Sequence, residues 1–324
     1  MPSQPSGPKV SILATRAAER AAALGASLPR GWSVAEGADG HAAADYLVVH
    51  DGVADDALLA EAGRLRRVIR LAEGDGTVDE EACARRGVPV DVVESSTTIS
   101  VAEHAVTAIL LLFKRVAQAS ELLRAGRIVD GVAPAPTSQT SYAFNWVGLT
   151  RWETLHGKRV GLVGLGGIGG HVARRLRCFG ADVAYTKPNR LDADREAELG
   201  VRYASFDELL ASARCVSLHN RHTPETERMM GAREFASMPQ GSFFVNTARG
   251  GLVDEEALVD ALVSGHLAGA ALDVFRVEPL PPDSPLLGAP NLLLTPHVGG
   301  IPVAESDTIA YQQAARLMVA DLGR

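Results

Sequence analysis

A glycine-rich turn constrains the fold of this chain more than any other feature. The stretch VGLVGLGGIGGHVARRL, residues 160–176, reads as a buried strand, a glycine turn and then a helix. In this context the pattern G-x-G-x-x-G is typical of a dinucleotide site. Its first glycine suits a tight turn, its second lets a pyrophosphate approach the backbone, and its third lets helix and strand pack closely. The free N–H groups of the helix N-terminus would face the phosphates. We therefore expect dinucleotide contacts at Gly164, Gly166, Gly167, Ile168 and Gly169.

Strand-like and helix-like runs alternate along the chain in two series. The first series has strand-like runs at 10–15, 45–52, 67–74 and 88–93, with alanine-rich helical runs between them. The second has strand-like runs at 160–164, 182–186, 215–219, 242–247, 269–274 and 291–296, again separated by helical runs. Such alternation predicts parallel sheets with crossover helices. We therefore expect an α/β protein with two doubly wound parallel sheets.

The segment between the two series departs from the alternation. Residues 101–126 predict one long helix, with Ser100 as its N-cap, Glu103 as the capping-box partner and Gly126 at its C-terminal end. Proline, serine, threonine and glycine then dominate, which predicts a loop or an extended arm around residues 127–152. This stretch carries more aromatic side chains than a plain linker needs, namely Tyr142, Phe144, Trp146 and Trp152.

Composition limits the classes of function. The 324 residues are 46% hydrophobic and 22% charged, which suits two packed cores. The formal net charge of −7 argues against binding of nucleic acid or an anionic membrane surface. The longest apolar run, 106–113, is shorter than the roughly 20 residues that span a bilayer. The N-terminus lacks the apolar core of a signal peptide. The three cysteines have no metal-ligand spacing. We expect a cytoplasmic protein without a metal site or a membrane span.

The end of the second strand of the glycine-turn series bears on the choice of dinucleotide. An NAD site usually has Asp or Glu there to bind the ribose hydroxyls. Here Thr186 stands in that place, and Lys187 and Arg190 follow. Without a carboxylate to repel it, a 2′-phosphate can be bound by these cations, so we expect NADP in preference to NAD. The alternative is that both cations are solvated turn residues.

Four further segments carry a resemblance. They are SVAEHAV (100–106), NTARGGLVDEEAL (246–258), ALDVFRVEPL (271–280) and LLTPHVGG (293–300). Together with the glycine turn they resemble the D-isomer-specific 2-hydroxyacid dehydrogenase family, glyoxylate and hydroxypyruvate reductases included, in the right order from about residue 60 to 320. The resemblance implies two Rossmann-like domains. It implies a flavodoxin-like substrate domain at 1–100 and 298–324, and an inserted NAD(P)-binding domain at 101–297 with a dimerisation arm around 127–152.

The same resemblance implies a reaction, hydride transfer between NAD(P)H and a 2-oxo acid or its D-2-hydroxy acid. The family's catalytic trio falls on Arg249, Glu278 and His297. His297 can exchange the proton because imidazole titrates near neutral pH. Glu278 would favour the imidazolium and orient it. The guanidinium of Arg249 suits a carboxylate or a polarised carbonyl.

The resemblance also implies further contacts. Around the cofactor it places His219, Asn220, Thr247, Ala248, Gly299 and, at the nicotinamide carboxamide, Asp273. In the loop 71–76, which would bind the substrate, it places Ala72, Glu73 and Gly74. Trp146 is the candidate for a side chain that one subunit of a homodimer lends to the substrate pocket of the other. Glu73 replaces a residue that is commonly apolar, and Arg221 and His222 replace a proline and an apolar residue, so the identity of the 2-oxo acid stays open.

Two other functions remain possible from the sequence. Some proteins of this superfamily sense nicotinamide state as transcriptional corepressors without turnover. Others oxidise phosphite or formate. Glu278 argues against formate, because formate dehydrogenases usually have glutamine there, whereas a phosphite substrate is not excluded.

Overall fold

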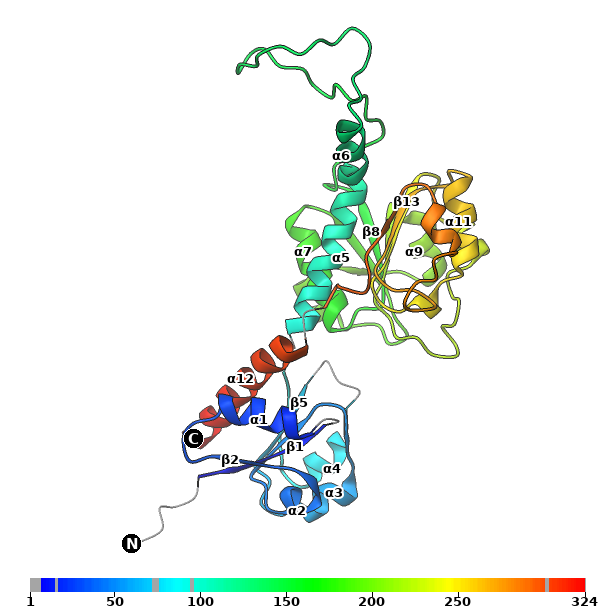
Figure 1. Cartoon of the computed structure of the whole chain (residues 1–324). Helices are drawn as coiled ribbons and strands as arrows, with labels where there is room; N and C mark the ends of the chain where they lie inside the picture. The colour runs from blue at the N-terminus through cyan, green and yellow to red at the C-terminus, as the bar shows by residue number, and fades with distance from the viewer. Residues whose placement is uncertain (1–6, 15–16, 72–75, 94–95, 301–302, 324) are drawn as a thin grey trace. The chain divides into compact units, whose positions relative to one another are not determined.

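Two parallel sheets organise the chain, one in each of two units (Figure 1). Unit 1 comprises residues 1–100 and 300–324, and unit 2 comprises residues 101–299. The computed structural model describes residues 7–14, 17–71, 76–93, 96–300 and 303–323. Every strand pair in the two sheets is parallel, and helices connect the strands. The predicted α/β class with two doubly wound sheets is confirmed.

The sheet of unit 1 has five strands in the order β2-β1-β3-β5-β7, which is the flavodoxin-like order. The strands are β1 (Lys9–Leu13), β2 (Ser33–Ala35), β3 (Tyr46–Val49), β5 (Arg67–Leu71) and β7 (Val90–Val93). The helices are α1 (Ala17–Ser27), α2 (Gly37–Ala42), α3 (Asp56–Glu61), α4 (Glu80–Arg85) and the C-terminal α12 (Val303–Leu322). A separate short pair joins β4 (Val53–Ala54) to β6 (Thr77–Val78).

The sheet of unit 2 has seven strands in the order β10-β9-β8-β11-β12-β13-β14. They are β8 (Arg159–Val163), β9 (Asp182–Thr186), β10 (Arg202–Tyr203), β11 (Cys215–Leu218), β12 (Ser242–Asn246), β13 (Leu267–Leu272) and β14 (Leu292–Leu294). The strand order reverses between β8 and β11. In open parallel sheets, ligands bind at such a reversal, outside the carboxyl ends of the strands.

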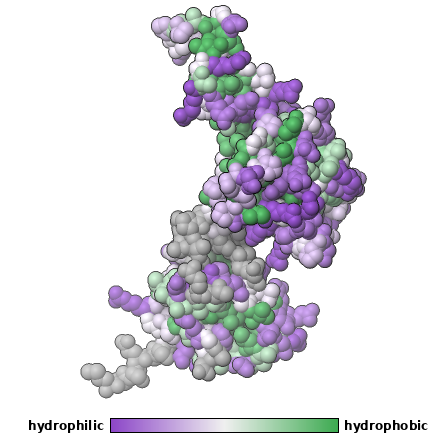
Figure 2. Space-filling model, turned by 45° about the vertical axis from the view of Figure 1, so that its right-hand side comes forward, coloured by the Kyte–Doolittle hydropathy of each residue, from purple (hydrophilic) through white to green (hydrophobic). Residues whose placement is uncertain are grey.

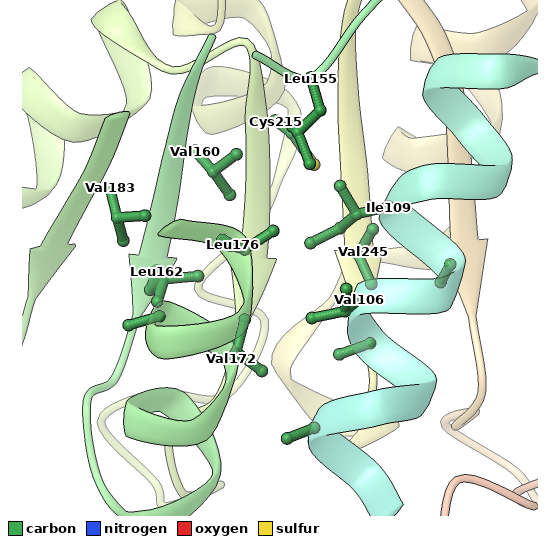
Figure 3. Packing of buried hydrophobic residues seen from close by; sticks show 14 of the residues in the cluster. Val106, Ile109, Leu155, Val160, Leu162, Val172, Leu176, Val183, Cys215 and Val245 are labelled. Carbon is green, nitrogen blue, oxygen red and sulfur yellow. The ribbon is translucent and has the colours of Figure 1, made fainter. Parts of the chain in front are cut away.

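Helices cover both faces of the second sheet. On one face, α5 (Ser96–Lys114) and α7 (Gly167–Cys178) pack on apolar side chains of the sheet (Figure 3). On the other face lie α9 (Phe206–Ser212), α10 (Ala232–Ser237) and α11 (Glu255–Val263). The short α8 (Ala193–Leu199) precedes the edge strand β10. Because the strands are buried on both sides, they read as continuous apolar runs in the sequence.

The segment expected as one helix from 101 to 126 forms two helices, so that prediction was wrong. α5 ends at Lys114 and α6 (Val116–Arg124) follows, with Arg115 between them in the left-handed region at φ 49°. The Arg115 guanidinium donates to Gln118 and to the carbonyl of Ala268, which holds this break in place.

The expected N-cap of this helix was also wrong, because α5 begins at Ser96 and Ser100 lies inside it. The buried face of α5 starts earlier than expected, with Thr98, Ala102 and Ala105 buried at helical spacing. Gly126, at φ +69°, follows α6 in the left-handed conformation that suits the residue after a helix.

α5 is also apolar enough, by length and composition alone, to cross a membrane over the window 97–114. This window is longer than the apolar run 106–113 of the sequence. In the structure 44% of the longer window is buried, and Ile109 and Phe113 have no exposed surface in the core of unit 2. Packing against the sheet accounts for the apolar face of α5.

α6 and residues 127–152, together called the arm, project from the rest of unit 2 (Figure 1). No residue of α6 is buried. Tyr142 and Phe144 are 68% and 76% exposed, and Trp146 and Trp152 are about 40% exposed. Figure 2 shows apolar atoms gathered at the end of this projection. The arm therefore presents large apolar side chains that unit 2 itself does not cover.

Candidate active site

The predicted glycine turn lies at the point where the strand order of unit 2 reverses. Gly164 has φ +93°, and a Cβ there would lie 2.6 Å from the backbone nitrogen of Asn220. A Cβ at Gly169 would lie 2.6 Å from the carbonyl oxygen of Gly164. A Cβ at Gly166 would meet no atom within 4 Å. Two glycines are thus required by close packing, and the third leaves open space beside the first turn of α7, where Gly167 and Ile168 lie.

Thr186 and Lys187 lie directly beside this turn. Thr186 ends β9, and its carbonyl oxygen accepts the N–H of Gly164 at 2.9 Å. The Lys187 Nζ lies 3.5 Å from the carbonyl oxygen of Leu165. The structure therefore brings one predicted cation to the edge of the glycine turn.

The second predicted cation, Arg190, is engaged with its own neighbours. Its Nε and Nη2 donate to the two carboxylate oxygens of Glu196 at 2.8 and 3.0 Å, and its guanidinium lies over the ring of Tyr203. The hydroxyl of Tyr185 donates to the same carboxylate at 2.8 Å. The hydrogen bonds from Arg190 and Tyr185 lower the pKa of Glu196. The charge of Arg190 is thus balanced by the carboxylate of Glu196, which was not among the predicted site residues.

Three buried polar atoms near the carboxyl ends of β11 and β12 lack a hydrogen-bond partner among the described residues. They are His219 Nδ1, Asn220 Oδ1 and Thr247 Oγ1. The other nitrogen of His219 lies 2.9 Å from the hydroxyl of Ser217. Burial lowers the pKa of His219 to about 4, so this imidazole is neutral near pH 7. Buried polar atoms are nearly always hydrogen-bonded, so such orphans beside a glycine turn fit a polar ligand.

The structure brings His297 and Glu278 together. The Nδ1 of His297 lies 2.7 Å from Oε2 of Glu278, and Oε1 of Glu278 accepts the N–H of Phe275 at 2.9 Å. Burial alone would raise the pKa of Glu278, but the hydrogen bonds from His297 and Phe275 outweigh it and lower that pKa. The carboxylate is therefore ionised near neutral pH. It is positioned to fix the ring of His297 with Nε2 left for another partner.

Arg249 reaches the same place from the end of β12. The loop that carries it is fastened by Asn246, whose amide donates to the Arg249 carbonyl at 2.9 Å and accepts the Ala248 N–H at 3.0 Å. The next residue, Gly250, is in such close contact with the chain at Phe275 that a Cβ would lie 1.9 Å from the Phe275 carbonyl carbon. Close backbone packing thus joins the loop of Arg249 to the loop of Glu278.

A pocket of about 420 Å³ lies over this junction, within unit 2. The three residues expected as a catalytic trio share it with residues that the sequence did not single out as site residues, namely His222, Glu227, Gly250, Gly251, Phe275 and Arg276. His222 forms a close hydrogen bond to Glu227, and its ring packs where a Cβ at Gly251 would lie. The unusual residue types at 221 and 222 were visible in the sequence, but only the fold brings His222 to the pocket.

Asp273 is a buried anchor for the chain just after His297. Its two carboxylate oxygens accept the N–H groups of Val298 and Gly299 at 3.0 and 2.8 Å, and the hydroxyl of Thr295 at 2.6 Å. Asp273 is only 3% exposed. These three donors leave one of the roughly four acceptor positions of the carboxylate, and Nε2 of His104 lies 3.5 Å from Oδ1 on that group.

Two sets of predicted substrate contacts have different outcomes. Ala72, Glu73 and Gly74 lie outside the described residues. Trp146 lies in the arm, where its carbonyl oxygen accepts the N–H of Val129 at 2.8 Å, and the residues lining the pocket do not include it. Its expected role in a substrate pocket therefore depends on a second copy of the chain.

The comparisons with known proteins agree with this geometry. A family model described as "D-isomer specific 2-hydroxyacid dehydrogenase, NAD binding domain" matches residues 106–299. A glyoxylate reductase of Korarchaeum cryptofilum is 36% identical over 243 residues, which cover 75% of this chain and 69% of that protein.

The chain belongs to the D-isomer specific 2-hydroxyacid dehydrogenase family. The matched residues lie in unit 2, which therefore carries the NAD-binding domain of the family, and the cofactor class is a nicotinamide dinucleotide. A D-3-phosphoglycerate dehydrogenase of Mycobacterium leprae is 38% identical over 281 residues. Those residues cover 86% of this chain but 50% of that protein, so the chain spans about half the length of this relative.

Solved structures of family members have the same fold. A D-isomer specific 2-hydroxyacid dehydrogenase from Xanthobacter autotrophicus Py2, in complex with NADPH and MES, aligns with a TM-score of 0.62 and 28% identity, over 98% of this chain and 95% of that one. A glyoxylate reductase from Paecilomyes thermophila aligns with a TM-score of 0.59 and 27% identity, over 98% and 94% of the two chains.

Proposed function

We propose that this protein is an NAD(P)-dependent oxidoreductase that interconverts a 2-oxo acid and the corresponding D-2-hydroxy acid. The observation that carries the proposal is the pocket at which Arg249 and the hydrogen-bonded pair His297–Glu278 converge. In this proposal unit 2 binds the cofactor and unit 1 contributes the substrate domain. Family membership supports the reaction class, and the proposal extends it to this chain.

Unit 2 offers a fitting cradle for the dinucleotide. The pyrophosphate would lie over Gly166 at the start of α7, where no side chain blocks the free N–H groups. The orphaned polar atoms of His219, Asn220 and Thr247 would bind the neighbouring parts of the cofactor, together with Ala248, Asp273 and Gly299. The bound cofactor would supply the hydride that reduces a carbonyl carbon.

The remaining chemistry comes from side chains of the pocket. Arg249 would bind the substrate carboxylate and polarise its carbonyl, because its permanent charge suits an oxygen on which negative charge develops. His297 would give its Nε2 proton to that oxygen in reduction and take it back in oxidation. Glu278 holds Nδ1 of the ring, so Nε2 is the nitrogen that faces the substrate.

NADP(H) is the proposed cofactor rather than NAD(H). Thr186 gives no carboxylate to repel a 2′-phosphate, and Lys187 lies at the glycine turn with its ammonium free to move toward one. Arg190 would help only after exchanging Glu196 for the phosphate. Lys187 is therefore the principal cation of this proposal.

We also propose a homodimer joined through the arm. The exposed aromatic side chains of residues 142–152 suit an interface, because aromatic rings bury a large area with few rotatable bonds. Phe144 and Trp152 lie close together, with ring centroids 6.2 Å apart and the two ring planes tilted by 54°. Trp146 would then reach the substrate pocket of the second subunit.

A substrate panel tests the proposed reaction. The wild-type protein would be incubated with glyoxylate, hydroxypyruvate, phenylpyruvate or 3-phosphohydroxypyruvate, in parallel with NADH and with NADPH. The absorbance of the reduced nicotinamide would be followed over time. We expect oxidation of the cofactor with at least one 2-oxo acid, and a D-2-hydroxy acid as the product. Tight cofactor binding without turnover of any of these would favour a nicotinamide sensor, and reduction of NAD(P) by phosphite would identify the other alternative.

A further inference from the structure

A series of hydrogen bonds connects helix α5 to the loop that carries His297. The Nε2 of His104 lies 3.1 Å from the hydroxyl of Thr295. That hydroxyl lies 2.6 Å from Asp273 Oδ1, and the carboxylate of Asp273 accepts the backbone N–H groups of Val298 and Gly299. His104 belongs to the segment 100–106, which the proposed reaction does not otherwise use.

The direction of each hydrogen bond follows from the groups involved. The Thr295 hydroxyl donates its single proton to Oδ1 of Asp273. The hydroxyl oxygen must then accept from His104, which requires a proton on Nε2 of that imidazole. His104 is therefore the first donor in this series of hydrogen bonds. Replacing it with an apolar residue would remove one of the two hydrogen bonds of the Thr295 hydroxyl.

These hydrogen bonds anchor the segment around His297, whose backbone is strained. His297 has φ 55°, in the left-handed region that side chains other than glycine rarely adopt. Such a conformation is unfavourable and persists only where the surrounding contacts enforce it. The enforcing contacts lie on both sides of the residue: the N–H of His297 bonds to the Thr295 carbonyl at 3.0 Å, and Asp273 binds the two following N–H groups.

We propose that His104 is a positioning residue for His297. It orients the Thr295 hydroxyl, Thr295 orients Asp273, and Asp273 holds the chain at 298–299 so that the left-handed backbone of His297 aims its imidazole at the pocket. Gly299 packs closely on this relay, since a Cβ there would lie 2.8 Å from Asp273 Oδ2 and 3.5 Å from the ring of His104. His104, Thr295 and Asp273 also line a cavity of about 50 Å³. The effect on turnover rests on the proposed function, but the effect on the loop does not.

Two variants separate the donor from the bulk of the side chain. His104→Gln keeps an N–H donor at about the reach of Nε2, whereas His104→Met fills similar space without a donor. Hydrogen exchange, followed by mass spectrometry of the purified full-length protein, reports on the peptide covering residues 295–300. We expect exchange there to be about 3- to 30-fold faster in His104→Met and near the wild-type rate in His104→Gln. The peptide containing Gly164 and its N–H bond to Thr186 serves as the control and should not change.

Kinetics give the second readout. In His104→Met we expect kcat for the best 2-oxo acid to fall about 3- to 30-fold, with the KM for the nicotinamide cofactor unchanged and kcat restored in His104→Gln. Thr295→Val breaks the relay at its middle and leaves the 3.5 Å contact between His104 Nε2 and Asp273 Oδ1, so adding His104→Met to it should lower kcat less than His104→Met does in the wild type. Unchanged exchange and kcat in His104→Met, or equal acceleration of exchange in the control peptide, would overturn the proposal. If the wild type reduces no 2-oxo acid, the proposed function fails while the exchange experiment still decides the role of His104.

Discussion

Gly250 lies against the backbone of Phe275, so close that a Cβ at residue 250 would be 1.9 Å from the Phe275 carbonyl carbon and 2.0 Å from its oxygen. The atoms in the way belong to the main chain and cannot rotate aside. Because Arg249 precedes Gly250 and Glu278 lies three residues beyond Phe275, this contact sets the spacing of the two loops that line the pocket.

Gly250→Ala should therefore separate these loops. We expect kcat/KM for the best 2-oxo acid to fall by at least about 100-fold, as misplacement of reacting groups by about 1 Å can cost. A lower melting temperature should accompany it. The matched control is Gly251→Ala, where the three atoms nearest to the new Cβ all belong to the side chain of His222, at 2.5–3.1 Å, and not to the main chain. Equal activity in the two variants would show that the spacing of the loops is not set by this contact.

His297→Asn should remove proton transfer without disturbing the loop. Asparagine tolerates the left-handed backbone better than most residues, so the φ of 55° can persist. We expect turnover to fall by roughly 10²–10⁴-fold, the usual contribution of general acid–base catalysis. The dissociation constant for NADPH, from quenching of tryptophan fluorescence, should stay within about twofold. His222→Asn alters the other histidine of the pocket and should lose far less turnover. A His297→Asn variant that keeps most of its turnover would exclude His297 as the proton donor.

Cofactor preference should respond to Thr186 and to Glu196 in opposite directions. A carboxylate in Thr186→Asp would repel the 2′-phosphate and move the ratio of kcat/KM values toward NADH. Glu196→Gln would release Arg190 from its paired carboxylate and move the ratio toward NADPH. Each shift should reach about tenfold, corresponding to roughly 1.4 kcal/mol. A wild-type protein that strongly prefers NADH, or an unchanged ratio in Thr186→Asp, would contradict the proposed choice of NADP(H).

The stability of the cofactor-free protein should fall with acidification because of His219. Burial lowers the pKa of His219 from 6.5 to about 4, so the unfolded chain binds a proton at this group over a pH range in which the folded protein does not. The stabilising contribution is complete above pH 6.5 and is lost as the pH falls toward 4. It amounts to about 3 kcal/mol. Urea unfolding at several pH values gives the free energy of unfolding. Between pH 6.5 and 4.5 this free energy should change less with pH in His219→Gln than in the wild type. Equal slopes in the two proteins would contradict the role given to His219.

The arm should carry the association of two chains. Phe144→Ala combined with Trp152→Ala removes this pair of neighbouring rings, and light scattering should then give the mass of a monomer where the wild type gives that of a dimer. Trp146→Ala should leave the dimer intact, raise the KM for the 2-oxo acid and spare cofactor binding. The control is Gln139→Ala, a substitution of an exposed residue in the same arm. A wild-type monomer with full activity would contradict this role of the arm.

The two sheets and the glycine turn could be predicted from the sequence, whereas several local backbone conformations could not. Apolar runs of strand length and the glycine turn predict both sheets, because burial on two faces leaves a continuous apolar signal. The strand β2 and the helix α2 were missed, since strand β2 has only three residues and α2 contains two glycines. The break at Arg115 was missed because its cause is a contact with Ala268, which lies far away in sequence.

The candidate site shows the same division. Short sequence segments pointed to Arg249, Glu278 and His297 as a trio. In the structure Nδ1 of His297 lies 2.7 Å from Oε2 of Glu278, as a pair of this kind requires. Glu196 and His222 were not predicted as site partners. Their contacts depend on which turns meet at the carboxyl edge of the sheet, and no local pattern records that.

The chain passes between the two units at residues 100–101 and 299–300. The location of these crossings bears on domain insertion, in engineering and in evolution. Within unit 2, Gly299 lies beside His104, so the end of the inserted segment lies near its beginning. Within unit 1, a Cβ at Gly300 would lie 3.2 Å from the methyl group of Thr97, so the two flanking ends also adjoin. Domains whose ends lie together tolerate insertion and circular permutation. A gene rearrangement that transplants codons 101–299 as one cassette, or that closes residue 100 onto residue 300 with a few glycines, would divide helix α5 but would cut no strand of either sheet.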